Sequence, residues 1–115
     1  MQHVLVVDDE PVIRALVAAG LQTDDLQVTG VADGFTAMAA VEDAVPDLVL
    51  VDVGLPGMNG CEVLRRLRTN PDTAAIPVLL LTGLEPAEDT GADGIVHKPF
   101  TLQALRDSVA AYLRK

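Results

Sequence analysis

The stretch Val4-Leu5-Val6-Val7-Asp8-Asp9 decides the fold, because a short and fully apolar run ends abruptly on acidic residues. Three other short runs also end on residues that can do chemistry: Leu48–Val51 on Asp52, Val78–Leu81 on Thr82, and Ile95–His97 on Lys98. Apolar runs of this length, separated by helix-like segments, are typical of parallel strands buried on both faces. Such sheets place their sites at the carboxyl ends of the strands. We therefore expect acids, a hydroxyl and an amine to meet at one edge of a sheet.

Helix signals separate these runs. Starts are indicated at three places: Asp9-Glu10-Pro11, where Asp9 can cap, Asp33-Gly34, and Asn59, which can cap a helix to about Thr69. Leu26–Val31 predicts a further strand, and apolar residues at helical spacing from Leu102 to Leu113 predict the last helix. Strands and helices alternate along residues 1–115 as one domain. They predict an α/β fold, a doubly wound five-stranded parallel sheet in the flavodoxin-like order 2-1-3-4-5.

The composition narrows the class of protein. A formal net charge of −9, with no basic stripe of interleaved aromatics, argues against direct nucleic-acid binding. A single cysteine, Cys61, excludes an internal disulfide, and no run resembles a signal peptide or a membrane span. We expect a cytoplasmic protein without membrane contact. Cys61 is expected to be a partly buried helix residue without a redox role, and Arg65, Arg66 and Arg68 a solvated helix face.

The predicted edge favours phosphoryl chemistry. In the order 2-1-3-4-5 the first and third strands are neighbours, so Asp8 and Asp9 should face Asp52. Three unpaired carboxylates this close repel one another, which calls for a cation among them. Oxygen ligands on an open edge match Mg²⁺, and Lys98 supplies a second positive charge. One carboxylate, best Asp52, can then attack a phosphoryl donor while the Thr82 hydroxyl stabilises the phosphoryl oxygens.

Four ordered motifs carry a family resemblance. They are Val6-Val7-Asp8-Asp9-Glu10-Pro11, then Asp52 with Leu55-Pro56-Gly57-Met58-Asn59-Gly60, then Leu81-Thr82, and finally Gly91-Ala92-Asp93-Gly94 before Lys98-Pro99-Phe100. Each motif alone is a weak signal, but the ordered set spans essentially the whole chain. The set resembles the receiver domain of bacterial two-component response regulators, of which the chemotaxis response regulator is the simplest relative.

The resemblance implies a signalling phosphoacceptor that catalyses its own phosphorylation and dephosphorylation, not a turnover enzyme. Asp52 would accept phosphate from a phosphohistidine, and Thr82 and Lys98 would bind the phosphoryl group. The implied Mg²⁺ ligands are Asp8, Asp9, Asp52 and the main-chain carbonyl of Gly54. The implied partners are a sensor histidine kinase or phosphotransfer protein and a downstream protein target or fused output domain, and a homodimer stays open.

Three features depart from the usual receiver pattern. Only 16 positions separate Thr82 from Lys98, so we expect a shortened or irregular fourth helix between them. Ile95 occupies a strand position where receivers often carry a switching Tyr or Phe, which predicts a smaller or differently located switch involving Thr82. Gly54 and Leu84 stand where receivers tune the access of hydrolytic water. Neither side chain can orient a water molecule, so we expect slow self-dephosphorylation.

Three alternatives compete with this interpretation. A haloacid-dehalogenase-like phosphatase would carry a second Asp where this chain has Gly54, and its cap domain does not fit in 115 residues. A flavodoxin-like electron carrier is disfavoured because Asp8-Asp9-Glu10 would repel the phosphate of FMN. Asp9, taken alone, could be no more than a helix cap. A receiver-like adaptor that works without phosphorylation remains open, since the switch position is altered.

Overall fold

Five parallel strands form one sheet in the order β2-β1-β3-β4-β5. The computed structural model describes residues 1–83 and 91–113. The strands are β1 (Gln2–Val7), β2 (Leu26–Val31), β3 (Leu48–Asp52), β4 (Val78–Thr82) and β5 (Gly94–His97). The helices are α1 (Pro11–Leu21), α2 (Gly34–Asp43), α3 (Gly60–Thr69) and α4 (Leu102–Tyr112). The predicted α/β class and strand order are confirmed.

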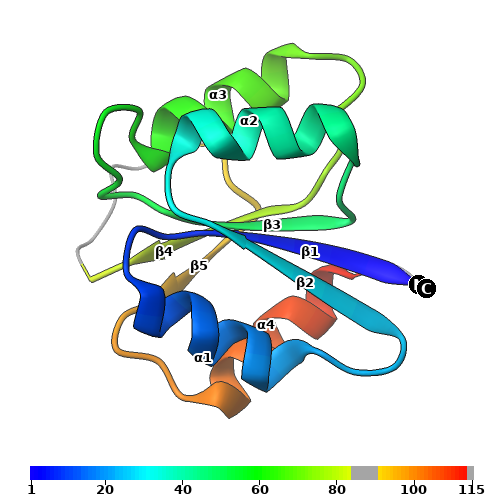
Figure 1. Ribbon diagram of the computed structural model, residues 1–115, viewed down its shortest axis with the longest axis vertical. Coiled ribbons are helices and arrows are strands. Elements are labelled where there is room, and N and C mark those ends of the chain that lie inside the picture. Colours follow the sequence, from blue (N-terminus) through cyan, green and yellow to red (C-terminus); the bar gives the residue numbers. More distant parts are fainter. Residues whose placement is uncertain (84–90, 114–115) are drawn as a thin grey trace.

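Helices cover both faces of this sheet (Figure 1). α2 and α3 lie on one face, whereas α1 and α4 lie on the other, so the molecule has three layers. The strand order reverses between β1 and β3, as expected for a doubly wound sheet. The N-terminus lies at the edge where β1 begins, and the parallel strands end at the opposite edge.

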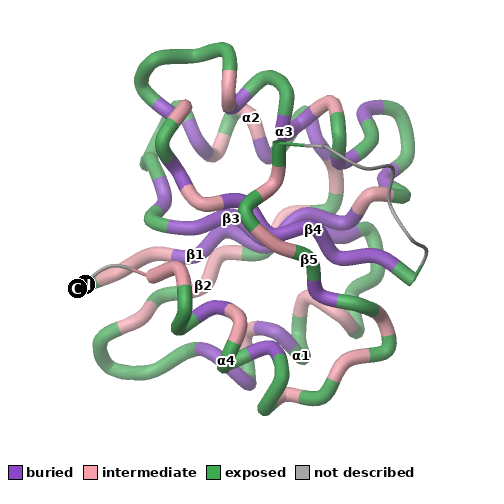
Figure 2. The backbone as a smooth tube through the Cα atoms, turned by 180° about the vertical axis from the view of Figure 1, so that it is seen from behind, coloured by how far each residue is buried: buried purple, intermediate pink, exposed green. Residues whose placement is uncertain are grey.

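The apolar runs are explained by burial on both faces. In β1, Leu5 and Val7 pack under α2 and α3, whereas Val4 and Val6 pack under α1 and α4. β3 and β4 alternate in the same way, because successive side chains of a strand point to opposite faces. Figure 2 shows the resulting band of buried residues along the central strands. The strand ends are therefore held by a rigid core.

The helix starts differ in one respect that matters for the site. Three helices have side-chain caps: Asp33 accepts from the Thr36 N–H at 2.7 Å, Asn59 from that of Glu62 at 3.0 Å, and Thr101 from that of Ala104 at 3.0 Å. α1 begins instead after Glu10, whose side chain makes no capping bond. The suggestion that Asp9 caps this helix is wrong, since the acids there are directed elsewhere.

Two expectations for α3 also need correction. Arg65 and Arg66 are solvated and pair with Glu62, but Arg68 reaches away from the helix to main-chain carbonyls and Asp93. Cys61 is exposed, not partly buried. Both errors arise because a helical sequence pattern does not show which neighbour lies beside each position.

Two other expectations concern helices: a shortened fourth helix and the lack of a membrane-spanning one. The predicted short fourth helix falls on residues 84–90, which lie outside the described residues. None of the described helices combines the length and the apolar character that crossing a membrane requires.

Candidate functional site

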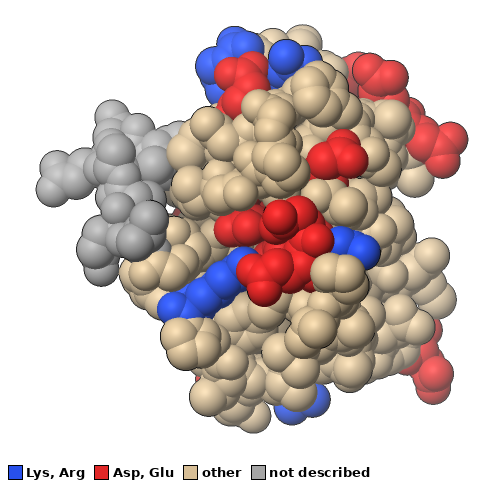
Figure 3. Space-filling view, turned by 60° about the vertical axis from the view of Figure 1, so that its left-hand side comes forward, with Lys and Arg blue, Asp and Glu red and all other residues tan. Residues whose placement is uncertain are grey.

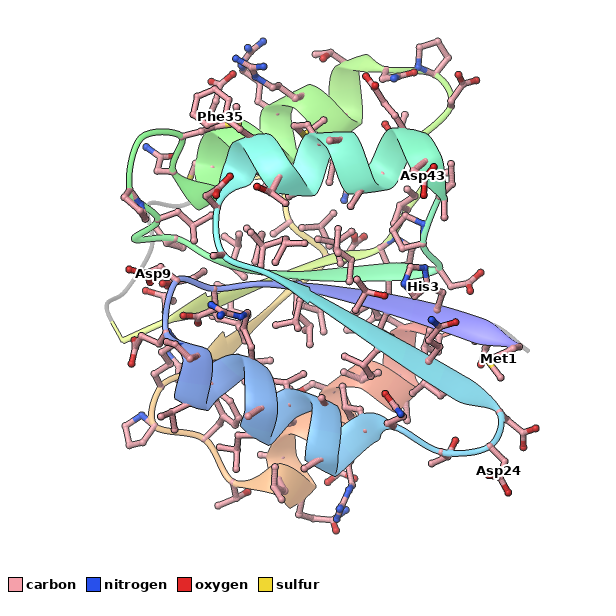
Figure 4. The ribbon with its side chains drawn as sticks, viewed as in Figure 1. Met1, His3, Asp9, Asp24, Phe35 and Asp43 are labelled. Atoms are coloured by element: carbon pink, nitrogen blue, oxygen red, sulfur yellow. The ribbon has the colours of Figure 1, made fainter. Side chains whose placement is uncertain are left out.

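The carboxyl-end edge of the sheet gathers the residues singled out from the sequence. Val7 of β1 pairs with Val51 of β3. Asp8 and Asp52, the next residues in the chain, therefore lie side by side at the ends of neighbouring strands. Thr82 ends β4, and its carbonyl accepts the Lys98 N–H at 2.8 Å, which ties the fourth and fifth strands together. Figure 4 shows Asp9 at this edge, opposite the edge that carries Met1 and His3. The strand ends thus bring the predicted acids, hydroxyl and amine together.

Two of the acids at this edge, Asp8 and Asp52, are shielded from water. Asp8 is completely buried, Asp52 is 9% exposed and Thr82 is 5% exposed, whereas Asp9 is exposed. A buried carboxylate is costly unless it is paired and hydrogen-bonded. Asp8 meets this condition through the Glu10 N–H, which donates to its Oδ1 at 2.9 Å, and through a lysine at its Oδ2.

Lys98 is the cation that joins the carboxylates. Its Nζ lies 2.7 Å from Oδ2 of Asp8, 3.5 Å from Oε1 of Glu10 and 3.6 Å from Oδ2 of Asp52. Only 17% of its side chain is exposed, so water screens these charges poorly. One lysine therefore faces three carboxylates, and the acidic charge at the site is in excess.

Burial and like charge raise the pKa of Asp52. Desolvation is the main cause, and the charges of Asp8 and Asp9 add to it, whereas the Gly54 N–H, 3.3 Å from Oδ1, and the Lys98 ammonium act in the opposite sense. A partly desolvated carboxylate with a raised pKa is a better nucleophile than a solvated one. These conditions suit Asp52 to attack an electrophile.

Lys98 responds to the same neighbours in the opposite direction. Burial by itself lowers the pKa of Lys98, but the hydrogen bond to Asp8 and the charges of Asp8, Asp52 and Glu10 outweigh it. The pKa of the ammonium group therefore lies above its ordinary value, and Lys98 stays charged throughout the neutral range.

The donor set fits a hard divalent cation. Carboxylate oxygens of Asp8, Asp9 and Glu10 lie within 4.8 Å of one another. Oxygen-only donors on an open edge are what Mg²⁺ prefers, because it keeps several waters. Figure 3 shows acidic atoms gathered in one patch, with Lys and Arg atoms beside it. A Cβ at Gly54 would meet no atom within 4 Å, so the space beside the Asp52 loop is open.

Sequence reasoning missed the contribution of Glu10. The sequence places Glu10 at a helix start and does not predict it as a site residue, yet its carboxylate belongs to the acidic group and approaches Lys98. The signal that could have found it was its position directly after Asp8 and Asp9. A hollow of about 330 Å³ lies beside Lys98, lined by Glu10, Ile13, Leu16, Lys98, Pro99 and Phe100.

The switch position lies away from this acidic group. Ile95 is 39% exposed and pairs with Leu80 of β4, whereas Thr82 is buried at the strand end. Leu84, the second residue expected to influence water access, lies outside the described residues.

Similar proteins of known structure share this fold over nearly the whole chain. The chemotaxis protein CheY4 of Vibrio cholerae is 33% identical, with a TM-score of 0.91, and the match covers 98% of this chain and 99% of that one. The receiver domain of the sensor histidine kinase PA1611 from Pseudomonas aeruginosa is 28% identical, with a TM-score of 0.87 and 96% coverage of both chains. That structure has a magnesium ion coordinated in its active-site cleft.

Curated relatives are longer than this chain. The probable transcriptional regulatory protein TcrX of Mycobacterium tuberculosis is 40% identical over 97% of this chain and 50% of its own length. The DNA-binding response regulator MtrA of Mycolicibacterium smegmatis is 38% identical over 99% of this chain and 51% of its own. The chain thus spans about half the length of these relatives. Because some of them are DNA-binding regulators, the expected lack of direct nucleic-acid binding gains no support.

The family assignment rests on both the fold and the sequence. The model of the response regulator receiver domain matches residues 4–110, which include every residue placed at the acidic edge. The strand order agrees with the fold of the similar receiver structures. This chain belongs to the response regulator receiver domain family.

Proposed function

We propose that this chain is a phosphoacceptor domain in which Asp52 receives a phosphoryl group from the phosphohistidine of a sensor histidine kinase or phosphotransfer protein. The observation that carries the proposal is the position of Lys98, whose Nζ lies within 3.6 Å of both Asp8 and Asp52. A shared cation between two buried carboxylates, beside a cluster of oxygen donors, suits a site that handles a transferred anion.

The proposed reaction is an in-line displacement at phosphorus. An Asp52 carboxylate oxygen attacks the phosphorus, the P–N bond of phosphohistidine breaks, and the imidazole nitrogen leaves with the electron pair. Lys98 neutralises charge on the phosphoryl oxygens, and the Thr82 hydroxyl is positioned at the strand end to donate a hydrogen bond to one of them. Burial of Asp52 limits hydration of the nucleophile and so favours attack.

The metal in this proposal is Mg²⁺. Asp8, Asp9, Asp52 and the carbonyl of Gly54 would hold it, with Glu10 as a further nearby carboxylate. When bound, Mg²⁺ supplies positive charge to the phosphoryl oxygens as negative charge is transferred to Asp52. Its arrival would also relieve the excess acidic charge that a single lysine leaves at this edge.

The residues that depart from the usual receiver pattern, Ile95 and Gly54, bear on the size of the switch and on the lifetime of the phosphoryl group. Thr82 and Ile95 are the proposed switch pair, and the aliphatic Ile95 gains no hydrogen bond when it moves, so we propose a small switch. Gly54 cannot orient a water molecule, so we propose slow loss of the phosphoryl group. The single domain 1–115 would pass its signal to a protein target or a fused output domain, in the cytoplasm, as a monomer or homodimer.

Intact mass after incubation with acetyl phosphate tests the acceptor. We expect an adduct of one phosphoryl group on wild type with Mg²⁺, and no adduct without Mg²⁺ or on Asp52→Asn. A folded wild type that forms no adduct, even with a competent phosphohistidine donor, would contradict the proposal and favour an adaptor that works without phosphorylation. An adduct that persists on Asp52→Asn would place the acceptor elsewhere.

A further inference from the structure

We propose that Arg14 is a positioning residue for the acidic site, because it holds the main-chain carbonyl of Asp8 and so fixes the turn that carries Asp8, Asp9 and Glu10. Arg14 is the one charged residue within α1, whose sequence is otherwise apolar. The proposal rests on the proposed function, since it explains how the same site is kept ready for Mg²⁺ and phosphoryl transfer.

The contact closes the β1–α1 turn. Nη1 of Arg14 donates to the carbonyl oxygen of Asp8 at 2.8 Å, in a partly buried setting. The main-chain N–H of Arg14 also donates to the Glu10 carbonyl at 3.2 Å, so the residue is fixed in the first turn of α1. The guanidinium thus reaches back across the turn to the end of β1.

Strand β2 provides room for this arginine. Gly30 of β2 pairs with Val6 of β1. The aliphatic part of the Arg14 side chain lies against Gly30. A Cβ at Gly30 would lie 3.3 Å from Cδ and 3.4 Å from Cβ of Arg14, tighter than ordinary van der Waals contact. The extended path of the side chain across the end of the sheet therefore depends on a glycine in the neighbouring strand.

The arginine completes the restraints on Asp8. The Asp8 N–H donates to the Val31 carbonyl at 3.1 Å, its carboxylate is held by the Glu10 N–H and by Lys98, and its carbonyl is held by Arg14. α1 lacks the side-chain cap that orders the starts of the other described helices. Arg14 thus provides a restraint on this turn from within α1.

Two physical effects of Arg14 on metal binding oppose one another. Its positive charge near the acids weakens attraction for Mg²⁺, whereas preorganisation of the oxygen donors strengthens binding. Because the guanidinium is bonded to a carbonyl and not to a carboxylate, we assign the larger effect to preorganisation. Loss of an outer partner of a metal site typically weakens binding by about 10-fold or more.

The test uses Arg14→Met, which keeps an unbranched stem over Gly30 but removes the donors. Arg106→Met is the matched control, since Nε of Arg106 donates to the Gly20 carbonyl at 2.8 Å and joins α4 to the far end of α1. The chain has no tryptophan, so Mg²⁺ affinity is measured by titrating amide NMR signals with MgCl₂. In the metal-free proteins, hydrogen exchange of the Glu10 amide reports on the turn itself.

We expect Arg14→Met to weaken Mg²⁺ binding by about 10-fold and to speed exchange of the Glu10 amide, with partial recovery in Arg14→Lys. Arg106→Met should lower stability to a similar extent without either effect. Tighter Mg²⁺ binding in Arg14→Met, unchanged Glu10 exchange, or equal weakening in both Met variants would overturn the proposal. If wild type binds no Mg²⁺, the proposed function fails, while the Glu10 exchange rates still decide whether Arg14 positions the turn.

Discussion

The two edges of the sheet each carry a long basic side chain in a partly buried setting, but they use it in opposite ways. At the carboxyl-end edge, Lys98 faces three carboxylates. At the amino-end edge, Arg68 pairs with Asp93 at 2.7 Å, and its other nitrogens donate to main-chain carbonyls. At the first edge one lysine faces an excess of carboxylates, whereas at the second the charges of Arg68 and Asp93 balance one another. The uncompensated negative charge is available to bind a cation.

The balanced edge is a structural junction. Arg68 donates to the carbonyls of Ala74 and Ile76 at 3.2 and 2.7 Å, and so fixes the loop that enters β4. The carboxylate of Asp93 also accepts the Val78 N–H at 2.8 Å, and its carbonyl accepts the Tyr112 hydroxyl at 2.8 Å. α3, α4 and the starts of β4 and β5 therefore meet at one ion pair. This edge stabilises the fold, while the other edge is kept reactive at a cost in stability.

The largest effect on stability is expected from removing Arg68, the cation that pairs with Asp93. Arg68→Met should lower the free energy of unfolding by about 3 kcal/mol, because the Asp93 carboxylate and partly buried carbonyls lose their donors. Urea denaturation measures the change. Arg66→Met, from the exposed face of the same helix, is the control and should cost far less. Similar losses in both variants would mean that the two arginines are equivalent, contrary to the comparison.

The next effect is expected at the acidic edge. Lys98→Met should lower the free energy of unfolding by about 2 kcal/mol at neutral pH, because Asp8 would keep only the Glu10 N–H. Since the pKa of Lys98 is raised in the fold, its contribution is present below its ordinary value of 10.5 and is lost only as pH rises further.

Magnesium distinguishes the two edges in these variants. MgCl₂ should recover part of the stability of Lys98→Met, because a divalent cation can replace the missing charge among the acids. It should not recover Arg68→Met. Thermal unfolding of both variants with and without MgCl₂ makes the comparison, and recovery of both or of neither would break it.

A gain in stability is expected from removing an acid at the same edge. Asp52→Asn should raise the free energy of unfolding by about 1 kcal/mol at neutral pH, because a desolvated charge beside Asp8 is removed. The pKa of Asp52 is raised in the fold, so its ionised form destabilises the native state above that pKa. The gain should therefore shrink as pH falls and the carboxyl group becomes protonated in the wild type. A destabilised Asp52→Asn at neutral pH would refute this view of the acidic edge.

The smallest effect is expected from an exposed ion pair that belongs to neither edge. Hydrogen bonds from Arg65 and Arg66 lower the pKa of Glu62 to about 2. Its contribution to stability is therefore present above the ordinary value of 4.5 and is lost as pH falls towards 2. Glu62→Gln should lower the melting temperature slightly at neutral pH and low salt, and not at all in high salt. A loss of stability as large as that of Lys98→Met would show that an exposed ion pair contributes as much as a buried one.

Features that depend on local contacts were readable from the sequence. Asn59 caps α3 as expected, because a cap needs only a polar side chain and an N–H three residues away. The strands were readable because burial on both faces leaves runs such as Val4–Val7 without polar residues. The capping role suggested for Asp9 failed, since two adjacent acids offered the same local signal for a cap and for a site.

Features that depend on distant contacts were not readable. Arg68 has the spacing of a solvated helix position, yet its partner Asp93 is 25 residues further along the chain. Arg14 shows the same limitation, because its role depends on Gly30 of another strand and on the carbonyl of Asp8, which no residue type reports. The sequence around Glu10 indicates only a helix start, although its carboxylate belongs to the acidic group.

The sequence by itself determined the strand order and the edge where the acids, the threonine and the lysine meet, because apolar runs and the handedness of crossovers permit few arrangements. Only the tertiary structure decided how charge is distributed there, with Lys98 against Asp8 across 90 residues and Arg14 on the Asp8 carbonyl. The physical reason is that burial is encoded by residue type, position by position. Electrostatic pairing depends on distances of a few ångströms that packing sets.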